Sequence, residues 1–212
     1  LVVPETILSY SGEGLSKLSQ QYHRCIRENV CRGVYSNKVR PVLINSWEAA
    51  FMDFDDVKLV EIAKAAKNMG VDLLVMDDGW FGKRDDDNSG LGDWYVNQDK
   101  IKCGLHKLVE QINDLGMKFG IWFEPEMVSE DSDLYRAHPE WAMQIPGRHA
   151  VRSRNQMALD MSRRDVQDYL IEQVNAILDD ANIYYVKWDI NRSLADIWSN
   201  ELPPERQGEV YH

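Results

Sequence analysis

The sequence predicts a parallel α/β fold and, within that class, an incomplete (β/α)8 barrel of the TIM type. The first observation is a series of short, nearly continuous apolar runs, which are typical of strands buried on both faces. The second is that amphipathic helical patterns lie between most of these runs. The third is that the runs end in polar clusters, as barrel strands do at the face that carries the active site. A doubly wound sheet would favour a glycine-rich turn after its first strand, and none follows Asn45.

Five apolar runs are the predicted strands. Four are strong and cover residues 41–48, 73–80, 119–126 and 183–189, and a weaker one covers residues 156–161. A closed barrel needs eight strands and about 250 residues, whereas the chain has 212. The tail from Asn200 onward is polar and offers no further strand. We therefore expect about the first five β/α units of the barrel.

Four amphipathic helices are predicted from the spacing of apolar residues. They cover residues 14–30, 55–70, 105–116 and 162–181. Asp55 and Gly70 have the positions of start and stop signals for the second helix. Ser162 and Asp165 have the spacing of a capping box before the fourth. Residues 1–40 are interpreted as a helical lead-in from an upstream domain, and residues 41–212 as the N-terminal part of the barrel domain.

Charge and cysteine content narrow the choice of function. The chain carries 24 basic and 35 acidic residues, a net charge of −11, which disfavours nucleic acid and membrane surfaces as partners. Cys25, Cys31 and Cys103 lack a zinc-like spacing and are interpreted as free thiols in a reducing compartment. No apolar stretch is long enough to span a bilayer, and residues 1–6 lack the features of a signal peptide. We therefore expect a cytoplasmic protein.

No metal and no cofactor are expected. The five histidines are scattered without ligand spacing. The acidic run 84–90 imitates the opening of an EF-hand calcium loop, but Val96 occupies the position where a bidentate glutamate is required. Phosphate-cradling glycines and a nucleotide fingerprint are also missing from the sequence. Residues 84–90 are therefore predicted to be a solvated loop at the active face, with Trp94 reaching toward a substrate.

The polar clusters at the strand ends suit an uncharged, polyhydroxylated substrate such as a sugar. Carboxylates accept hydrogen bonds from sugar hydroxyls, cations donate to them, and indole rings pack on the C–H face. In glycoside hydrolysis one carboxylate can attack the anomeric carbon while a second acts as acid. The attacking carboxylate must stay ionised. Lys187 projects to the same side of its strand as Asp189 and is expected to lower the pKa of that carboxyl.

Three motifs resemble those of the α-galactosidases of glycoside hydrolase family 36. They are Asp77-Asp78-Gly79-Trp80-Phe81, Trp122-Phe123-Glu124-Pro125-Glu126-Met127-Val128 and Lys187-Trp188-Asp189-x-Asn191-Arg192. They occur in the family's order, and the likeness runs from about residue 1 to the end. The resemblance implies a retaining, cofactor-free hydrolase that removes terminal α-linked galactose from small oligosaccharides such as melibiose and raffinose. It also implies a homo-oligomeric parent protein.

The resemblance assigns roles to eight residues. Asp189 is implied as the catalytic nucleophile. The implied substrate-binding residues are Asp77, Asp78, Trp47, Trp122, Arg154, Lys187 and Asn191. Structural readings stay open for some of them, because Trp47 and Trp122 suit a core and Arg154 suits a surface. Glu124 and Glu126 favour a structural turn, and Asp160 suits a backbone-bonding role as well as a ligand role.

One departure from the family pattern matters. The family's general acid/base aspartate follows a cysteine- and glycine-rich stretch in a later segment, and this sequence stops before it. We therefore expect the chain alone to lack the proton donor and to be nearly inactive. Two other functions stay open: an α-galactosyl transferase related to raffinose and stachyose synthases, which would keep Asp189, and a non-catalytic sugar-binding fragment. An incomplete barrel also leaves strand edges unpaired, which predicts poor solubility or pairing between copies.

Overall fold

The computed structural model describes residues 5–211. The chain divides into two compact units, Leu1–Pro41 and Val42–His212. This division lies one residue beyond the predicted boundary between residues 40 and 41. Residues 1–4, which belong to the predicted lead-in and to the segment searched for a signal peptide, lie outside the described residues, as does His212.

Within residues 5–41, the first unit contains one α-helix followed by a π-helical turn. Helix α1 spans Leu15–Cys25, and the π-helical turn η1 continues it over Ile26–Val30, so the helix predicted over residues 14–30 is confirmed. The amide of Cys31 donates to the carbonyl of Ile26, five residues back, at 2.8 Å, which is the hydrogen bond of a π-turn. No residue of α1 or η1 is buried, and Leu15 is 80% exposed. The hydrophobic core lies in the second unit.

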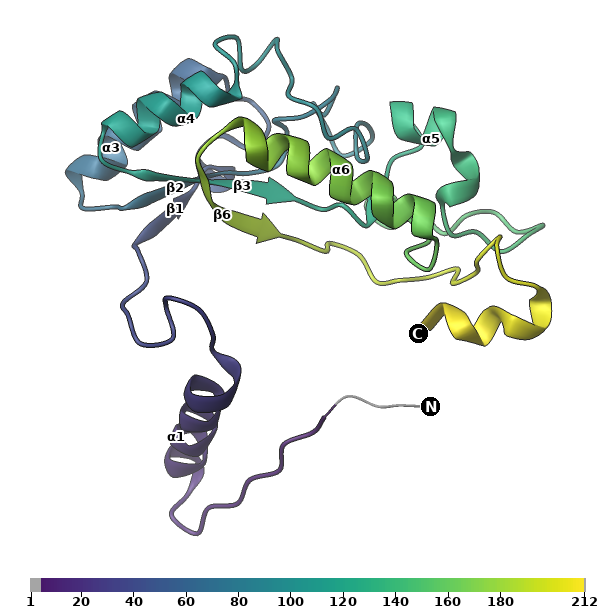
Figure 1. The fold of residues 1–212 in the computed structure, drawn as a ribbon, viewed down its shortest axis with the longest axis horizontal. Coiled ribbons are helices and arrows are strands. Elements are labelled where there is room, and N and C mark those ends of the chain that lie inside the picture. The colour runs from purple at the N-terminus through teal and green to yellow at the C-terminus, as the bar shows by residue number, and fades with distance from the viewer. Residues whose placement is uncertain (1–4, 212) are drawn as a thin grey trace. The chain divides into compact units, whose positions relative to one another are not determined.

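Four parallel strands form the main sheet of the second unit. They are β1 (Leu43–Asn45), β2 (Leu73–Met76), β3 (Lys118–Phe123) and β6 (Ile183–Trp188), in the spatial order β1-β2-β3-β6 (Figure 1). Each of the four strong apolar runs therefore overlaps a strand that is shorter than the run, and β3 begins one residue before its run. The register places Trp122 of β3 beside Lys187 of β6. Because all four strands run in one direction, the residues that follow them leave the sheet at the same edge.

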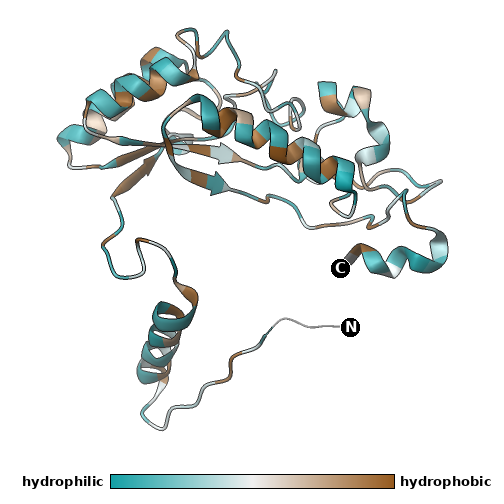
Figure 2. Ribbon diagram, viewed as in Figure 1, coloured by the Kyte–Doolittle hydropathy of each residue, from teal (hydrophilic) through white to brown (hydrophobic). Residues whose placement is uncertain are grey.

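Three long helices pack beside the sheet through their apolar sides. They are α3 (Asp56–Asn68), α4 (Leu105–Asp114) and α6 (Arg164–Asp180). Figure 2 shows these helices banded in brown and teal, as amphipathic helices are. In α4 the buried residues Leu105, Leu108 and Ile112 repeat at helical spacing. The Asp55 side chain caps α3 by accepting a hydrogen bond from the Lys58 amide at 2.8 Å, as predicted.

A small second sheet corrects the prediction for residues 156–161. Strand β5 (Met157–Ala158) pairs antiparallel with β4 (Met127–Val128) and is not part of the parallel sheet. The backbone of this segment bonds to loops: the Ala158 carbonyl accepts from Met143 at 2.8 Å, and the Leu159 amide donates to Glu126 at 2.7 Å. With these groups occupied, the segment cannot extend the sheet beside β3, where β6 pairs instead. The parallel sheet has four strands, not five, and residues 5–211 form an α/β fold without a closed barrel.

Other local predictions were also wrong. Helix α6 begins without a side-chain cap, because Arg163 and not Ser162 occupies the N-cap position; the Ser162 hydroxyl donates to Asp160 Oδ1 at 2.6 Å. Trp47 does not extend the first strand but begins the short helix α2 (Trp47–Ala50).

The remaining helical segments are α5 (Asp133–Ala137), η2 (Pro139–Trp141) and η3 (Pro204–Tyr211). Within residues 5–211, no helix has the length and apolar character needed to cross a membrane.

Candidate active site

The carboxyl-terminal edge of the parallel sheet opens into a cavity of about 140 Å³. The residues that line it are Trp47, Asp77, Asp78, Trp122, Arg154, Lys187, Asp189 and Asn191. These are the eight residues to which the sequence resemblance assigned a role. They come from the ends of three strands, β2, β3 and β6, and from two connections that are far apart in the sequence, and the parallel sheet brings them to one place.

The end of β2 contributes Asp77, which is buried and held from two sides. Its Oδ2 accepts a hydrogen bond from Asn45 Nδ2 at 2.6 Å and from Lys187 Nζ at 2.8 Å. Its backbone amide donates to Ser46 Oγ at 3.0 Å. Asn45 ends β1 and Lys187 belongs to β6, so donors from two other strands converge on one carboxylate.

The neighbouring carboxylate, Asp78, is bound by an arginine that the sequence analysis did not select. Arg84 Nε lies 3.1 Å from Oδ1 and Arg84 Nη2 lies 2.9 Å from Oδ2, which is a forked ion pair. Burial raises the pKa of Asp78, while the hydrogen bonds and charge of Arg84 oppose the rise. The sequence did contain a signal, because Arg84 directly precedes three aspartates and a buried arginine needs such partners.

The loop that contains Arg84 is only partly solvated, which corrects the prediction for residues 84–90. Asp85 and Asp86 are exposed, but Arg84 is 1% exposed and Gly90 is buried. Arg84 is buried because it extends inward to Asp78, and its Nη2 also lies 3.4 Å from Asp87 Oδ1. The loop therefore combines an acidic outer surface with a buried cation.

The end of β3 contributes Trp122, whose indole nitrogen donates to Asp189 Oδ2 at 3.0 Å. Its ring stacks on Phe81, with centroids 6.0 Å apart. At 1% exposure, Trp122 offers the cavity its N–H edge and no open ring face. The prediction for Trp94 was wrong: this side chain is buried against Phe81 and Trp122 and does not line the cavity. Packing in an aromatic cluster removes more apolar surface from water than an exposed loop position would.

Asp189 directly follows β6, and its carboxylate is accessible and held by hydrogen bonds. Its side chain is 29% exposed, and its Oδ1 accepts from the Ile190 amide at 3.0 Å. Burial alone would raise the pKa of Asp189. The hydrogen bonds from Trp122, Asn191 and the Ile190 amide, together with the charge of Lys187, outweigh burial and lower the pKa below its ordinary value. Asp189 is therefore ionised at neutral pH.

Lys187 acts on Asp189 less directly than the sequence suggested. Its Nζ lies 2.8 Å from Asp77 Oδ2 but 3.8 Å from Asp189 Oδ2. The three hydrogen bonds to Asp189 lower its pKa more than the charge of Lys187 does. Lys187 is thus mainly the partner of Asp77, because its side chain extends across the sheet from β6 toward β2.

The segment after the nucleophile candidate is fixed by a buried glutamate. Glu124 Oε1 accepts hydrogen bonds from the Asn191 amide at 2.5 Å and from Gln156 Nε2 at 3.0 Å. Burial raises the pKa of Glu124, and these two bonds oppose the rise. Glu124 does not line the cavity. Its contacts fix the backbone two residues beyond Asp189 and so serve the site indirectly.

Arg154 and Trp47 come from connections between the sheet strands. Arg154 and Asn155 have positive φ angles of 53° and 58°, as in a type I′ turn, between the bridged residues Ser153 and Gln156. Trp47 opens α2 and meets Phe51 edge-on, with ring centroids 5.3 Å apart. Both Arg154 and Trp47 line the cavity.

Asp160 has a different place from the other candidates. It is buried, and its Oδ1 accepts hydrogen bonds from the hydroxyl of Ser162 at 2.6 Å and from the Ser162 amide at 3.1 Å. It does not line the cavity. Its observed contacts are those of a backbone-bonding residue.

The cavity combines one accessible anion with fixed hydrogen-bonding groups of both kinds. Asp77 and Asp78 present acceptor oxygens, while Lys187, Arg154 and Asn191 present donors. Such a set matches the hydroxyl groups of a sugar, each of which both donates and accepts. Within residues 5–211, no three His, Cys, Asp or Glu side chains are grouped so as to hold a metal ion. The arrangement therefore supports nucleophilic attack by a carboxylate on a bound sugar.

Comparison with protein families matches residues 2–212 to the family described as Melibiase. The chain is 60% identical over 200 residues to the bifunctional α-galactosidase/sucrose kinase AgaSK of Mediterraneibacter gnavus, covering 94% of this chain and 21% of that protein. It is 51% identical over 209 residues to the α-galactosidase AgaA of Geobacillus stearothermophilus, covering 99% of this chain and 29% of that protein.

Among solved structures, one relative was crystallised with a sugar. A variant of AgaA from Geobacillus stearothermophilus, described as a GH36 α-galactosidase in complex with stachyose, superposes with a TM-score of 0.91 at 50% identity. The match covers 95% of this chain and 28% of that chain. The chain therefore spans between a fifth and three tenths of the length of these relatives.

Proposed function

The chain belongs to the Melibiase family, and from this membership we propose that it carries the nucleophile-bearing part of the active site of an α-galactosidase. The resemblance to family 36 that the three sequence motifs indicated is confirmed. The reaction we propose is the retaining hydrolysis of a terminal α-linked galactose from a small oligosaccharide. The relatives named above are α-galactosidases, and one binds stachyose, which supports this substrate class.

The setting of Asp189 is the observation that carries the proposal. An attacking carboxylate must be ionised, accessible and held in one orientation. Asp189 meets these conditions through the lowered pKa, its partial exposure and the hydrogen bonds from Trp122 and Ile190. Its oxygen would attack C1 of the galactose and displace the oxygen of the leaving sugar. Water would then attack C1 of the glycosyl-enzyme ester, release galactose and restore the carboxylate.

The other cavity residues would bind the galactose hydroxyls. Asp77 and Asp78 are already oriented by Lys187 and Arg84, so they can accept hydrogen bonds without rearrangement. Arg154, Lys187 and Asn191 would donate. Trp47 remains the candidate for contact with the apolar face of the sugar, since Trp122 is almost fully buried.

The proton that the leaving oxygen requires would come from outside these 212 residues. Asp77 and Asp78, the other carboxylates of the cavity, are both engaged in ion pairs, with Lys187 and Arg84 respectively. A general acid must direct a proton at the leaving oxygen, whereas these two carboxylates direct their oxygens at the ammonium of Lys187 and the guanidinium of Arg84. We therefore propose that these 212 residues alone have little hydrolytic activity.

Trapping the intermediate tests the proposal. The intact protein that contains this chain would be treated with a fluorinated galactosyl donor that forms a slowly hydrolysed glycosyl-enzyme. Peptide mass spectrometry should then find one galactosyl adduct, on Asp189. A label on another side chain, or none during normal turnover, would contradict the assignment. Replacing Asp189 by Asn should abolish labelling, while the Asp168→Asn control on the outer face of α6 should leave it unchanged.

The same experiment separates hydrolysis from transfer. A transferase would form the same adduct on Asp189 but pass the galactosyl group to an added sugar in preference to water. Measuring released galactose against elongated acceptor, with sucrose or raffinose added, distinguishes the two. A non-catalytic sugar-binding protein would bind galactose without forming any adduct.

The cellular compartment and the oligomeric state of the protein also remain proposals. Cys25, Cys31 and Cys103 are free thiols, which supports a reducing compartment such as the cytoplasm. The oligomeric parent implied by the resemblance stays a prediction, which light scattering of the intact protein would test.

A further inference from the structure

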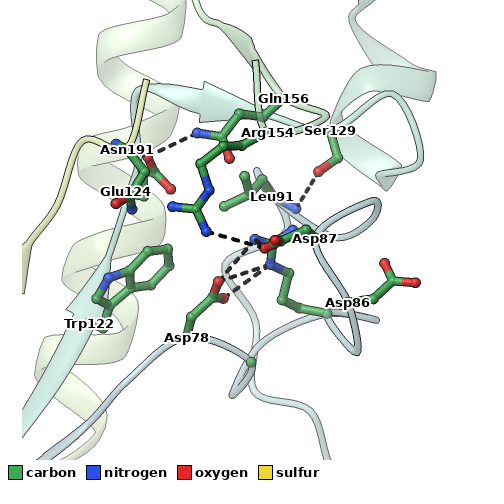
Figure 3. A network of polar contacts seen from close by, with 12 residues as sticks. Asp78, Asp86, Asp87, Leu91, Trp122, Glu124, Ser129, Arg154, Gln156 and Asn191 are labelled. Carbon is green, nitrogen blue, oxygen red and sulfur yellow. Dashed lines mark hydrogen bonds and ion pairs between the residues drawn. The ribbon is translucent and has the colours of Figure 1, made fainter. Parts of the chain in front are cut away.

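We propose that Arg84 and Asp87 are positioning residues that set the geometry of the sugar-binding pair Asp78 and Arg154. Neither Arg84 nor Asp87 lines the cavity. The four side chains form a chain of alternating charge, Asp78–Arg84–Asp87–Arg154, that starts and ends at the cavity wall. Figure 3 shows its members Asp78, Asp87 and Arg154. The inference rests on the proposed function, in which Asp78 and Arg154 contact the galactose.

Arg84 is the fixed centre of this charged chain. Its Nε and Nη2 bind Asp78 in a fork, and its Nη1 donates to the Ser89 carbonyl at 2.9 Å. The Nη2 also lies 3.4 Å from Asp87 Oδ1. A guanidinium that is 1% exposed is tolerated only where its donors are satisfied. These contacts therefore define one position for Arg84 and, through the fork, one orientation for Asp78.

The loop around Arg84 is folded tightly enough to hold it. Gly90 has a φ of +82°, and a Cβ atom there would lie 3.0 Å from the Cβ and the amide nitrogen of Arg84. The Leu91 amide donates to Ser129 Oγ at 3.2 Å (Figure 3), which ties the loop to the segment after β4. Lys100 Nζ donates to the Arg84 carbonyl at 3.1 Å and to the Gly79 carbonyl at 3.0 Å. One lysine thus fixes the backbone of Arg84 to the turn that follows Asp78.

Asp87 links the fixed guanidinium of Arg84 to the guanidinium of Arg154. Its Oδ1 lies 3.4 Å from Arg84 Nη2 and 3.5 Å from Arg154 Nη2, so one oxygen is shared by two guanidinium groups. The Arg154 side chain is 40% exposed and projects from a turn (Figure 3). A long, half-exposed side chain of this kind samples several rotamers unless a partner holds it. Asp87 is placed to select the rotamer that faces the cavity.

This arrangement predicts an effect on sugar binding and little effect on the chemical step. An arginine that is ordered before the substrate arrives lowers the entropy cost of binding. Asp189 lies outside the four-residue chain and keeps its own hydrogen bonds. Loss of Asp87 should therefore raise KM for an α-galactoside, while kcat changes little.

A double-mutant cycle in the intact protein tests the inference. KM and kcat for a 4-nitrophenyl α-galactoside, and galactose affinity by calorimetry, would be measured for Asp87→Asn, Arg154→Ala and the double variant. For Asp87→Asn we expect KM to rise about fivefold, as for a half-exposed ion pair. In the Arg154→Ala background the same replacement should cause no further rise. An equal rise in both backgrounds, or none in either, would overturn the inference.

Matched variants separate positioning from a general structural role. Asp86→Asn changes the neighbouring exposed aspartate, whose carboxylate caps the Asn88 amide, and should leave KM unchanged. Asp87→Glu keeps the charge and should recover part of the affinity, which a purely steric role would not predict. High salt should raise KM for the unsubstituted protein more than for Asp87→Asn. An unsubstituted protein that neither cleaves the galactoside nor binds galactose would overturn the proposed function itself.

Discussion

Two carboxylates at the ends of different strands of this sheet line the same cavity in opposite settings. Asp78, after β2, is buried, has a raised pKa and is bound in a fork by the buried Arg84. Asp189, after β6, is partly exposed, has a lowered pKa and is bound by the neutral N–H donors of Trp122 and Ile190. Both side chains face the space proposed to hold the sugar.

In the proposed reaction, this difference would separate holding the substrate from reacting with it. A carboxylate forked by a guanidinium has much of its hydrogen-bonding capacity occupied, and it would lose strong contacts if it attacked a carbon atom. A carboxylate that is stabilised mainly by neutral N–H groups stays ionised without a cation at hydrogen-bond distance. Asp78 is thus suited to bind and Asp189 to react. Four expected outcomes test this comparison, from the largest effect to the smallest.

The largest effect is expected for Asp189→Asn in the intact protein. The amide cannot form the glycosyl ester, so kcat/KM should fall by a factor on the order of 10⁴. Because Asp189 is partly exposed, the melting temperature should change little. Initial rates on an α-galactoside and a thermal melt measure the two quantities. Substantial residual hydrolysis would show that the reacting carboxylate is elsewhere.

Replacing Arg84 by Met should lower the free energy of unfolding. Removing one partner of a buried ion pair leaves Asp78 buried and unpaired, which costs about 3–5 kcal/mol of unfolding free energy. Chemical denaturation of the domain measures this cost. Arg164→Met is the matched control, because Arg164 pairs with Asp168 on an exposed face of α6 and should contribute less than about 1 kcal/mol. Equal losses of unfolding free energy for the two replacements would show that the buried ion pair with Asp78 contributes no more to stability than an exposed one.

Trp122→Phe should change how activity depends on pH. The replacement keeps an aromatic ring but removes the N–H group that donates to Asp189. We expect kcat/KM to fall about tenfold or more, as for a hydrogen bond to a charged group. The acid limb of the pH profile should move to higher pH, because the pKa of Asp189 is then less strongly lowered. Trp188→Phe removes the N–H group that donates to Glu126, and its acid limb should stay in place.

The smallest effect concerns the pH dependence of stability. The pKa of Asp189 is lower in the folded protein than in the unfolded chain. Its contribution to stability is therefore present above the unfolded pKa and is lost as pH falls through the folded pKa. The difference in melting temperature between the unsubstituted protein and Asp189→Asn should shrink as the pH is lowered from neutral to strongly acidic values. A difference that grows on acidification would contradict the direction of the shift.

Much of the fold and of the candidate site could be predicted before the structure. The four strong runs overlap the four parallel strands, and the helical patterns coincide with α1, α3, α4 and α6. The strand-end residues line one cavity. The weak run at residues 156–161 was wrongly assigned to the parallel sheet. A two-residue strand such as β5 is too short to show a periodicity, so its sequence does not reveal which strand it pairs with. Trp94 was misplaced for a related reason, since an aromatic residue suits both a core and a binding site.

The sequence by itself determined the alternation of strands and helices, and it placed polar residues where strands end. Both are local properties, because hydrophobic spacing and turn chemistry act over a few neighbouring residues. Only the tertiary structure decided which charges meet. Lys187 pairs with Asp77 more closely than with Asp189, Arg84 turns inward to Asp78, and Glu124 holds Asn191. Such pairs depend on distances across strands and loops, which arise only when the sheet and its helices have packed.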